Sequence, residues 1–258
     1  MKRDEIDCTL EQVAAVIHAI GLFVMNGVRV SETEFQEVSV QEGYALWAAS
    51  YDQEKNGLIF IEEQYTNRLL AQLPFSKMLD VGTGTGRHAL KLARRSVSVT
   101  AIDQSPEMLA VARRAAQREG LSIDFRLTSF DDGLPFEAQQ FDLLICALML
   151  SHVSNLTYSL QEFARVLQDG GYLLITDFHP FHTIYGWSTV FSHAGVKYRL
   201  PTIGHTRDDY LGAISASGLT VREVIDIPVG EVPVGYLPEE ILRNHAEKPF
   251  CLIILTQK

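Results

Sequence analysis

The stretch Met78-Leu-Asp-Val-Gly-Thr-Gly-Thr-Gly-Arg-His88 decides the fold of this chain. A short apolar run ends on Asp80, and Gly82, Gly84 and Gly86 then separate it from a helical pattern. Glycine has no Cβ, so it accepts positive φ and lets the backbone approach a ligand closely. A strand, a glycine-rich loop and a helix in this order predict a nucleotide-type crevice at the carboxyl end of the strand. The spacing Gly-x-Gly-x-Gly differs from the Gly-x-Gly-x-x-Gly of dinucleotide binders.

A second acid follows one helix and one strand later. The apolar run from Ser96 ends on Asp103, and a carboxylate at such a strand end can accept both hydrogen bonds from a ribose diol. Ser105 and Pro106 then predict the start of the next helix, as its N-cap and first residue. The alternative for Asp103 is a solvated carboxylate, but the glycine loop upstream favours the ribose role.

Strands and helices alternate from Lys77 onward. The predicted strands are Lys77–Val81, Val97–Asp103, Asp124–Ser129, Phe141–Ala147, Tyr172–Asp177, Leu219–Ile227 and Phe250–Thr256. The predicted helices are Arg87–Arg95, Pro106–Glu119, Leu156–Leu167 and Arg207–Ser217. This alternation predicts an α/β fold with a Rossmann-like, mostly parallel sheet that carries helices on both faces.

Composition limits the class of protein. The 258 residues, 47% of them hydrophobic, can bury one full core. The net charge of −10 disfavours a nucleic-acid partner, and the apolar stretch Val13–Val24 is too short to span a bilayer. Cys8, Cys146 and Cys251 lie far apart. They indicate reduced thiols of a cytoplasmic protein, with neither a disulfide frame nor a metal site.

Several ordered segments together resemble one family, the class I S-adenosylmethionine (SAM) dependent methyltransferases. Besides the glycine loop, these segments are Tyr44–Asp52, Leu134–Phe136 with Phe141–Ile145, Leu148–Val153 and Val166–Ile175. The chain is most similar to the methyltransferase type 11 subgroup, which includes enzymes of ubiquinone and menaquinone biosynthesis. The resemblance covers about residues 41–258. It implies a seven-stranded sheet whose last strand inserts antiparallel between the fifth and sixth strands.

The resemblance also implies a SAM site, whose product is S-adenosylhomocysteine. Asp80 and Gly82 would contact the methionyl amino group of SAM, and the segment that carries Tyr51 would close over that end. The glycine loop would approach SAM through Thr83, Gly84 and Gly86.

The resemblance assigns the ribose and adenine contacts of SAM as well. Asp103 would hold the ribose, and Gln104 and Met108 would flank the adenine. Ser129 stands where many relatives have an acid. Asp131 would then contact adenine N6, with the Phe130 amide bonding the ring. Cys146 and Ala147 would offer backbone groups to the cofactor.

Motifs that are missing from the sequence narrow the chemical class of the methyl acceptor. The sequence after Ile145 is Cys-Ala-Leu-Met149, without the Asn/Asp-Pro-Pro-aromatic cluster of amide and amino methyltransferases. A small-molecule acceptor with an O, N or C nucleophile is therefore expected. Histidine suits a general base near neutral pH, and His179 and His205 are the first candidates. His152 is the third, with cofactor or wall contacts as its alternative.

Two segments lie outside the seven-stranded fold that the resemblance implies. Residues 1–40 are expected to form a helical extension that packs on the body or on a second subunit, which makes a homodimer possible. Residues 181–202 are expected to form a hairpin insertion on the substrate side, whose aromatic side chains pack on the body or cover the acceptor.

Two competing functions stay open. They are a nicotinamide-dependent oxidoreductase on a similar sheet and a SAM-binding protein without turnover.

Overall fold

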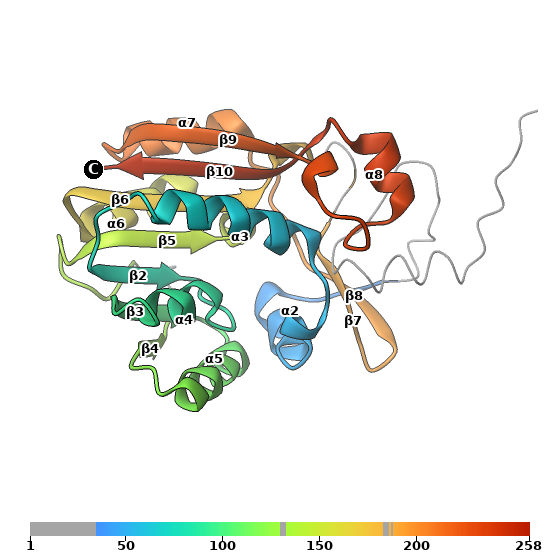
Figure 1. Ribbon diagram of the computed structural model, residues 1–258, viewed down its shortest axis with the longest axis horizontal. Helices are drawn as coiled ribbons and strands as arrows, with labels where there is room; N and C mark the ends of the chain where they lie inside the picture. The colour runs from blue at the N-terminus through green and yellow to red at the C-terminus, as the bar shows by residue number, and fades with distance from the viewer. Residues whose placement is uncertain (1–34, 130–132, 183–185, 187) are drawn as a thin grey trace, which may run out of the picture.

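A seven-stranded sheet organises the chain (Figure 1). The computed structural model describes residues 35–129, 133–182, 186 and 188–258. The order of the strands is β4-β3-β2-β5-β6-β10-β9, so β2 lies between β3 and β5 and pairs with both in parallel. The chain order reverses on either side of β2, and α/β proteins bind ligands at such a point.

The boundaries of the elements follow the predicted alternation. The strands of the main sheet are β2 (Lys77–Val81), β3 (Ser98–Asp103), β4 (Asp124–Leu127), β5 (Phe141–Ala147), β6 (Leu167–Phe178), β9 (Thr220–Pro228) and β10 (Pro249–Gln257). The helices that cover it are α3 (Gly57–Leu70), α4 (Arg87–Ala93), α5 (Pro106–Glu119), α6 (Leu156–Val166) and α7 (Arg207–Ala216). A short helix, α8 (Glu239–His245), precedes the last strand.

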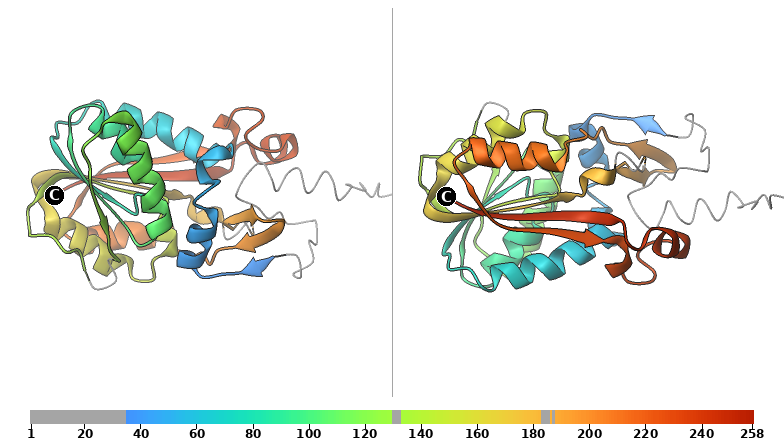
Figure 2. Two further views of the ribbon diagram at one scale, coloured as in Figure 1. Left: turned by 90° about the horizontal axis from the view of Figure 1, so that it is seen from below. Right: turned by 90° about the horizontal axis from the view of Figure 1, so that it is seen from above.

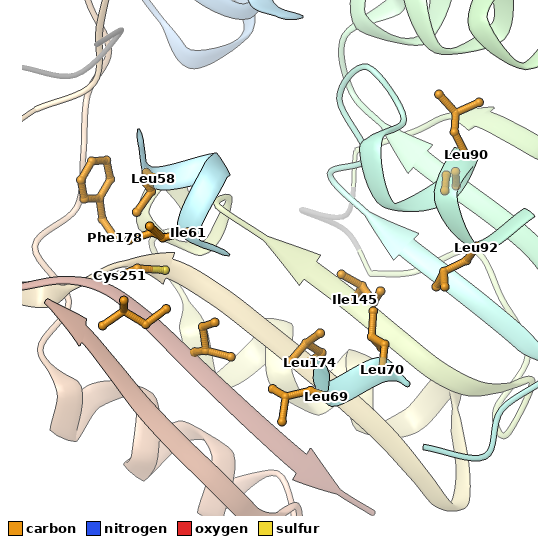
Figure 3. Close-up of a cluster of buried hydrophobic side chains, with 14 of the residues drawn as sticks. Leu58, Ile61, Leu69, Leu70, Leu90, Leu92, Ile145, Leu174, Phe178 and Cys251 are labelled. Atoms are coloured by element: carbon orange, nitrogen blue, oxygen red, sulfur yellow. The ribbon is translucent and has the colours of Figure 1, made fainter. Parts of the chain in front are cut away.

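Successive residues of the central strands enter two separate cores, because side chains alternate between the faces of a sheet. Met78 and Ile145 face the core that α3, α4 and α5 cover, where they meet Leu70 and Leu92. Figure 3 shows part of this cluster. Leu79, next to Met78, lies in the second core, which α6 and α7 cover. Figure 2 shows helices on both faces of the sheet. The predicted two-sided α/β arrangement is confirmed.

The last strand is antiparallel to its neighbours. β10 pairs antiparallel with β6 on one side and with β9 on the other, as the resemblance implies. Its apolar residues, from Phe250 to Leu255, are all at most 5% exposed. This strand therefore fills the centre of that half of the sheet.

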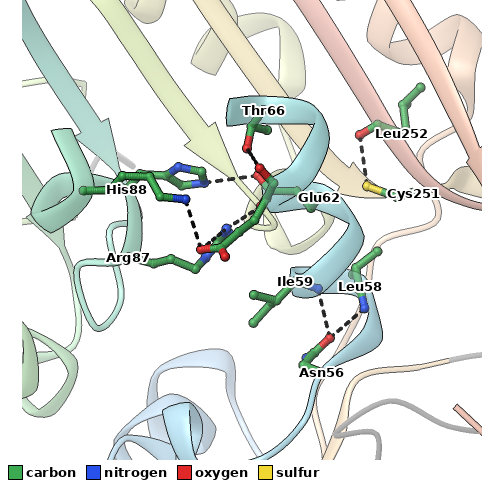
Figure 4. A network of polar contacts seen from close by, with 11 residues as sticks. Asn56, Leu58, Ile59, Glu62, Thr66, Arg87, His88, Cys251 and Leu252 are labelled. Carbon is green, nitrogen blue, oxygen red and sulfur yellow. Dashed lines mark hydrogen bonds and ion pairs between the residues drawn. The ribbon is translucent and has the colours of Figure 1, made fainter. Parts of the chain in front are cut away.

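A helix that the sequence analysis leaves unassigned, α3, carries a buried acid (Figure 4). The side chain of Asn56 caps its first turn by accepting from the amides of Leu58 and Ile59. Glu62, fully buried, pairs with Arg87 and lies 3.1 Å from His88 Nε2. Burial alone would raise the pKa of Glu62, but the charges of Arg87 and His88 outweigh it and lower that pKa to about 2. The network ties α3 to the first residues of α4.

A second, smaller sheet lies beside the first. The predicted hairpin is present as β7 (Val190–His193) and β8 (Val196–Arg199), and β1 (Gln36–Glu37) pairs with β8 in parallel. The predicted helical extension lies outside the described residues up to position 34, and residues 35–39 are extended or irregular. Tyr185 and Trp187 of the insertion also lie outside the described residues. Among the residues that are described, no helix combines the length and apolar character of a membrane span.

We predict that Glu62→Gln lowers the unfolding free energy by about 1–3 kcal/mol, because Arg87 and His88 lose their fully buried carboxylate partner. The folded-state pKa of Glu62 is depressed, so its contribution is present above pH 4.5 and is lost as the pH falls toward 2. The stability difference between wild type and variant should therefore shrink over that interval in urea titrations. Glu63→Gln is the control for an exposed carboxylate near the same cation, since Glu63 lies 3.5 Å from Arg87 but is one-third exposed and should contribute less. Equal stability of both variants would contradict the prediction.

Candidate functional site

A cavity of about 560 Å³ opens at the carboxyl ends of β2, β3 and β5. Its volume lies within the range of small-molecule sites, roughly 300–1,000 Å³. In Figure 1 the arrowheads of β2 and β5 point toward the helix α2 (Val40–Trp47), which closes the far side. The cavity is lined from the strand side by Gly82, Gly84, Ile102, Asp103, Gln104, Ser105, Met108, Thr128, Ala147 and Leu148. From the other side it is lined by Val40, Gln41, Tyr44, Tyr51, Met149, His152, Val153, Ser154, Asn155, Tyr158 and Ser159.

The glycine loop adopts the left-handed conformation that the sequence predicts. Gly82, Gly84 and Gly86 have φ of +71°, +56° and +89°. A Cβ on Gly82 would come within 2.8 Å of Met149 Cγ, whereas a Cβ on Gly84 would meet nothing within 4 Å. Gly84 therefore leaves open space beside the loop at the cavity. Gly86 does not line the cavity; it is the N-cap residue of α4.

Asp103 projects from the end of β3 into the same cavity. Its Oδ2 accepts the Gly84 amide at 2.7 Å, and its Oδ1 accepts the Ser105 amide at 2.8 Å. Burial, the largest influence, raises the pKa of this carboxyl despite those amide donors. A carboxylate has about four lone-pair sites, and the amides of Ser105, Gly84 and Gln104 act on this one, so capacity for a further donor remains. Gln104 and Met108 line the cavity next to it.

Asp80, in β2, and Thr83, in the glycine loop, do not line the cavity. Asp80 is 2% exposed, and its Oδ2 accepts the Thr83 hydroxyl at 2.7 Å. Burial raises the pKa of Asp80, although His88 and Arg87 act in the opposite direction. Buried Asp80 therefore holds the Thr83 side chain of the glycine loop in the protein interior.

The remaining predicted cofactor residues divide into three groups. Tyr51 and Ala147 line the cavity, whereas the side chain of Cys146 is fully buried in the core between the sheet and α6. Ser129 does not line the cavity, although its neighbour Thr128 does. Phe130 and Asp131 lie outside the described residues.

Tyr44 joins α2 to the loop after β5. Its hydroxyl lies 3.1 Å from His152 Nε2, and the Nδ1 of the same ring lies 2.8 Å from the Pro201 carbonyl. A carbonyl can only accept, so Nδ1 of His152 bears the hydrogen and Nε2 carries the lone pair. The Tyr44 hydroxyl therefore donates to His152. Burial lowers the pKa of His152 and raises that of Tyr44, so both groups are neutral near pH 7.

A family model described as a methyltransferase domain matches residues 79–175 of this chain. The match begins in β2 and ends in β6, so it contains the glycine loop, Asp103 and His152. Over these residues the chain is similar to methyltransferase domains. The family resemblance drawn from the sequence is thereby confirmed.

Curated relatives of the chain are named as methyltransferases as well. A demethylmenaquinone methyltransferase of Tropheryma whipplei (strain Twist) is 38% identical over 138 residues, which cover 52% of this chain and 56% of that protein. A ubiquinone biosynthesis O-methyltransferase of Xanthomonas axonopodis pv. citri (strain 306) is 37% identical over 101 residues, covering 39% and 42%. This chain thus spans about half the length of the curated relatives it matches. A SAM-dependent methyltransferase of Mesorhizobium loti shares the fold, with a TM-score of 0.58 and 20% identity over 74% of this chain and 96% of that one.

The three candidate histidines occupy different places. Only His152 is among the described residues that line the cavity. His179 is 3% exposed; its Nε2 lies 3.1 Å from Asp226 Oδ1, and its Nδ1 accepts the Phe181 amide at 3.3 Å. His205 donates from Nε2 to the Val153 carbonyl at 2.6 Å. Both nitrogens of His179 are therefore engaged inside the protein. The catalytic roles of all three stay predictions.

Sequence reasoning missed part of the cavity wall. Asn155, Tyr158 and Ser159 come from the first turn of α6 and its cap, and Met149 comes from the loop before it. Asn155 caps α6 by accepting the Tyr158 amide. An Asn before an apolar helical pattern marks a helix start. That signal, together with the expected crevice at the strand ends, was enough to place this turn at the cavity.

We predict that Tyr44→Phe loosens α2, because it removes the hydrogen bond from this helix to His152. One such bond contributes about 0.5–1.5 kcal/mol, so amide exchange of residues 40–47 should become about 2- to 10-fold faster in mass spectrometry. Tyr65→Phe is the matched control, since the Tyr65 hydroxyl bonds Glu231 and lies outside the cavity wall. Unchanged exchange in Tyr44→Phe would show that aromatic packing alone holds α2.

Proposed function

We propose that this protein transfers a methyl group from SAM to a small-molecule acceptor. One observation carries the proposal: the open backbone of Gly84 and the carboxylate of Asp103 face the same cavity at the carboxyl ends of β2 and β3. A ligand with a ribose diol fits there, because the Asp103 carboxylate keeps lone-pair capacity for a hydroxyl. SAM supplies, when bound, an electrophilic methyl group on a sulfonium centre.

The chain's own residues divide the work of holding SAM. Asp103 would accept the ribose hydroxyls, and Ile102, Gln104 and Met108 would enclose the adenine. Gly82 and Gly84 would let the loop backbone reach the methionine portion, with Asp80 holding the loop through the Thr83 hydroxyl. Tyr51 and the rest of the segment from α2 would close over it. Methyl transfer is an in-line displacement, so this positioning and the exclusion of water supply much of the rate.

The names of the relatives support a small, ring-bearing acceptor. They are named for demethylmenaquinone and for ubiquinone biosynthesis, and an acceptor of comparable chemistry is part of the proposal. A cytoplasmic location is also part of it, supported by the free, buried thiols of Cys146 and Cys251.

Thermal unfolding with added ligand tests the proposal against its competitors. SAM and S-adenosylhomocysteine should raise the melting temperature, because they bind only the folded state, and NAD(H) should not. Stabilisation by NAD(H) alone would establish the oxidoreductase instead. If SAM binds but no methyl group is transferred to any acceptor in a metabolite extract, the result would support a SAM-binding protein without turnover.

We predict that Asp103→Ala weakens S-adenosylhomocysteine binding by about 1–3 kcal/mol, the usual loss for charge-assisted hydrogen bonds. Calorimetric titration measures the affinity. Asp124→Ala is the control, because Asp124 is an exposed carboxylate paired with Arg126 at the start of β4. Equal affinity in the Asp103 variant and the wild type would remove Asp103 from the ligand site.

A second prediction separates ligand contact from backbone strain at Gly84. Gly84 and Gly120 both have positive φ, and a Cβ on either would meet nothing within 4 Å. Alanine at each position should therefore lower the unfolding free energy by a similar amount, about 1–2 kcal/mol. Gly120 ends α5 away from the cavity, so only Gly84→Ala should weaken S-adenosylhomocysteine binding, by about tenfold. Equal affinities would mean that the loop is only a turn.

A further inference from the structure

We propose that Tyr44 and His152 form a proton relay at the cavity and that the methyl acceptor is a neutral hydroxyl compound, a phenol or an enol. This inference rests on the proposed function and names the acceptor class. Tyr44 would touch the acceptor and is the catalytic residue; His152 acts through Tyr44 as a positioning residue and final proton holder.

The hydrogen-bond pattern gives the relay its direction. Pro201 occupies the Nδ1 hydrogen of His152, and the Tyr44 hydroxyl donates to Nε2. The Tyr44 oxygen thus keeps lone pairs for one donor from the cavity. A hydroxyl of the acceptor can supply that donor, which completes a chain from substrate O–H through Tyr44 to His152.

The charge of the cavity wall selects a neutral acceptor. Among the described residues that line it, none is Lys or Arg, and Asp103 is the only Asp or Glu. Asp103 lies on the strand side, and both of its oxygens already accept amides from Gly84 and Ser105. A carboxylate beside Tyr44 would lose its hydration without meeting a cationic side chain. An ammonium would have to lose a proton before its nitrogen could take the methyl group.

The relay also fits the protonation states of its members. Burial raises the pKa of Tyr44, with Tyr51, Asp103 and Asp177 adding to the effect. The Tyr44 hydroxyl therefore keeps its proton until the acceptor hydroxyl supplies another one. Burial lowers the pKa of His152, despite the Pro201 carbonyl and the Asp177 carboxylate, so Nε2 is free of a proton at pH 7.

The proposed step balances as follows. The acceptor hydroxyl gives its proton to the Tyr44 oxygen while the Tyr44 proton passes to His152 Nε2. The acceptor oxygen uses an electron pair to bond the methyl carbon as the methyl–sulfur bond breaks, and the pair of that bond stays on sulfur. The products are a methyl ether, S-adenosylhomocysteine and protonated His152, whose proton then leaves to solvent.

Three probes that share a 4-propylphenyl group and differ in charge test the acceptor class: 4-propylphenol, 4-propylbenzoate and 4-propylbenzylamine. Their affinities are measured by calorimetry on protein saturated with S-adenosylhomocysteine at pH 7.5. The phenol should bind at least about tenfold more tightly than either charged probe, and Tyr44→Phe should remove most of that preference. Tyr65→Phe should keep it. A charged probe that binds as tightly as the phenol, or a phenol that does not bind, overturns the inference.

His152→Gln separates a relay from a structural tether. Its amide oxygen can still accept the Tyr44 hydroxyl but cannot take a proton. The variant should keep wild-type amide exchange in residues 40–47 and phenol affinity within about threefold. Its single-turnover methylation of 4-propylphenol should be about 10²–10⁴-fold slower, the scale of lost proton transfer. A rate within threefold of wild type, or no methylation by the wild type, overturns the relay.

The outcome also separates this inference from the proposed function. If S-adenosylhomocysteine itself fails to bind in the first titration, the proposed function fails, and the relay fails with it. If it binds and the phenol preference or the His152→Gln effect is missing, only the acceptor class and the relay fail.

Discussion

The structure depends on how the backbone leaves β2. The amides of Gly82 and Thr83 both donate to the Ile102 carbonyl of the neighbouring strand, at 3.0 and 2.9 Å. Buried amides need such partners, and the turn that provides them requires positive φ at Gly82. This turn brings Gly84 to Asp103 at the end of β3. The same backbone pairing therefore completes the sheet and shapes the strand side of the cavity.

The supports of the loop come from segments that are distant in sequence. Glu62 on α3 holds Arg87 and His88, which begin α4 directly after the loop. The hydroxyl of Thr85, inside the loop, donates to the carboxylate of Asp52 at 2.9 Å. Asp52 lies in the segment that follows α2. The cavity loop is thus fixed by one buried ionic network below it and by one polar contact from the closing segment.

The closing helix has a small core of its own. Trp47 on α2 stacks on Phe191 of β7, with ring centroids 5.0 Å apart and planes 9° apart. Tyr44 and Tyr198 join the same cluster. In this cluster, Phe191 and Tyr198 of the insertion therefore pack with residues of α2. The hairpin thus holds the helix that carries Tyr44. Closure of residues 44–51 over a bound cofactor stays a prediction.

Sequence alone determined the elements whose signals are local. Apolar runs and caps predicted β2, β5 and α5 with the bounds that the structure has, and the glycine spacing with Asp103 predicted the strand side of the cavity. The sequence alone did not determine α3, because its pattern does not distinguish the buried Glu62 from a surface acid of an amphipathic helix. Nor could it choose among the three histidines. The contact of Tyr44 with His152 joins residues 108 positions apart, and only tertiary packing brings such groups together, because periodicity and capping report neighbours along the chain.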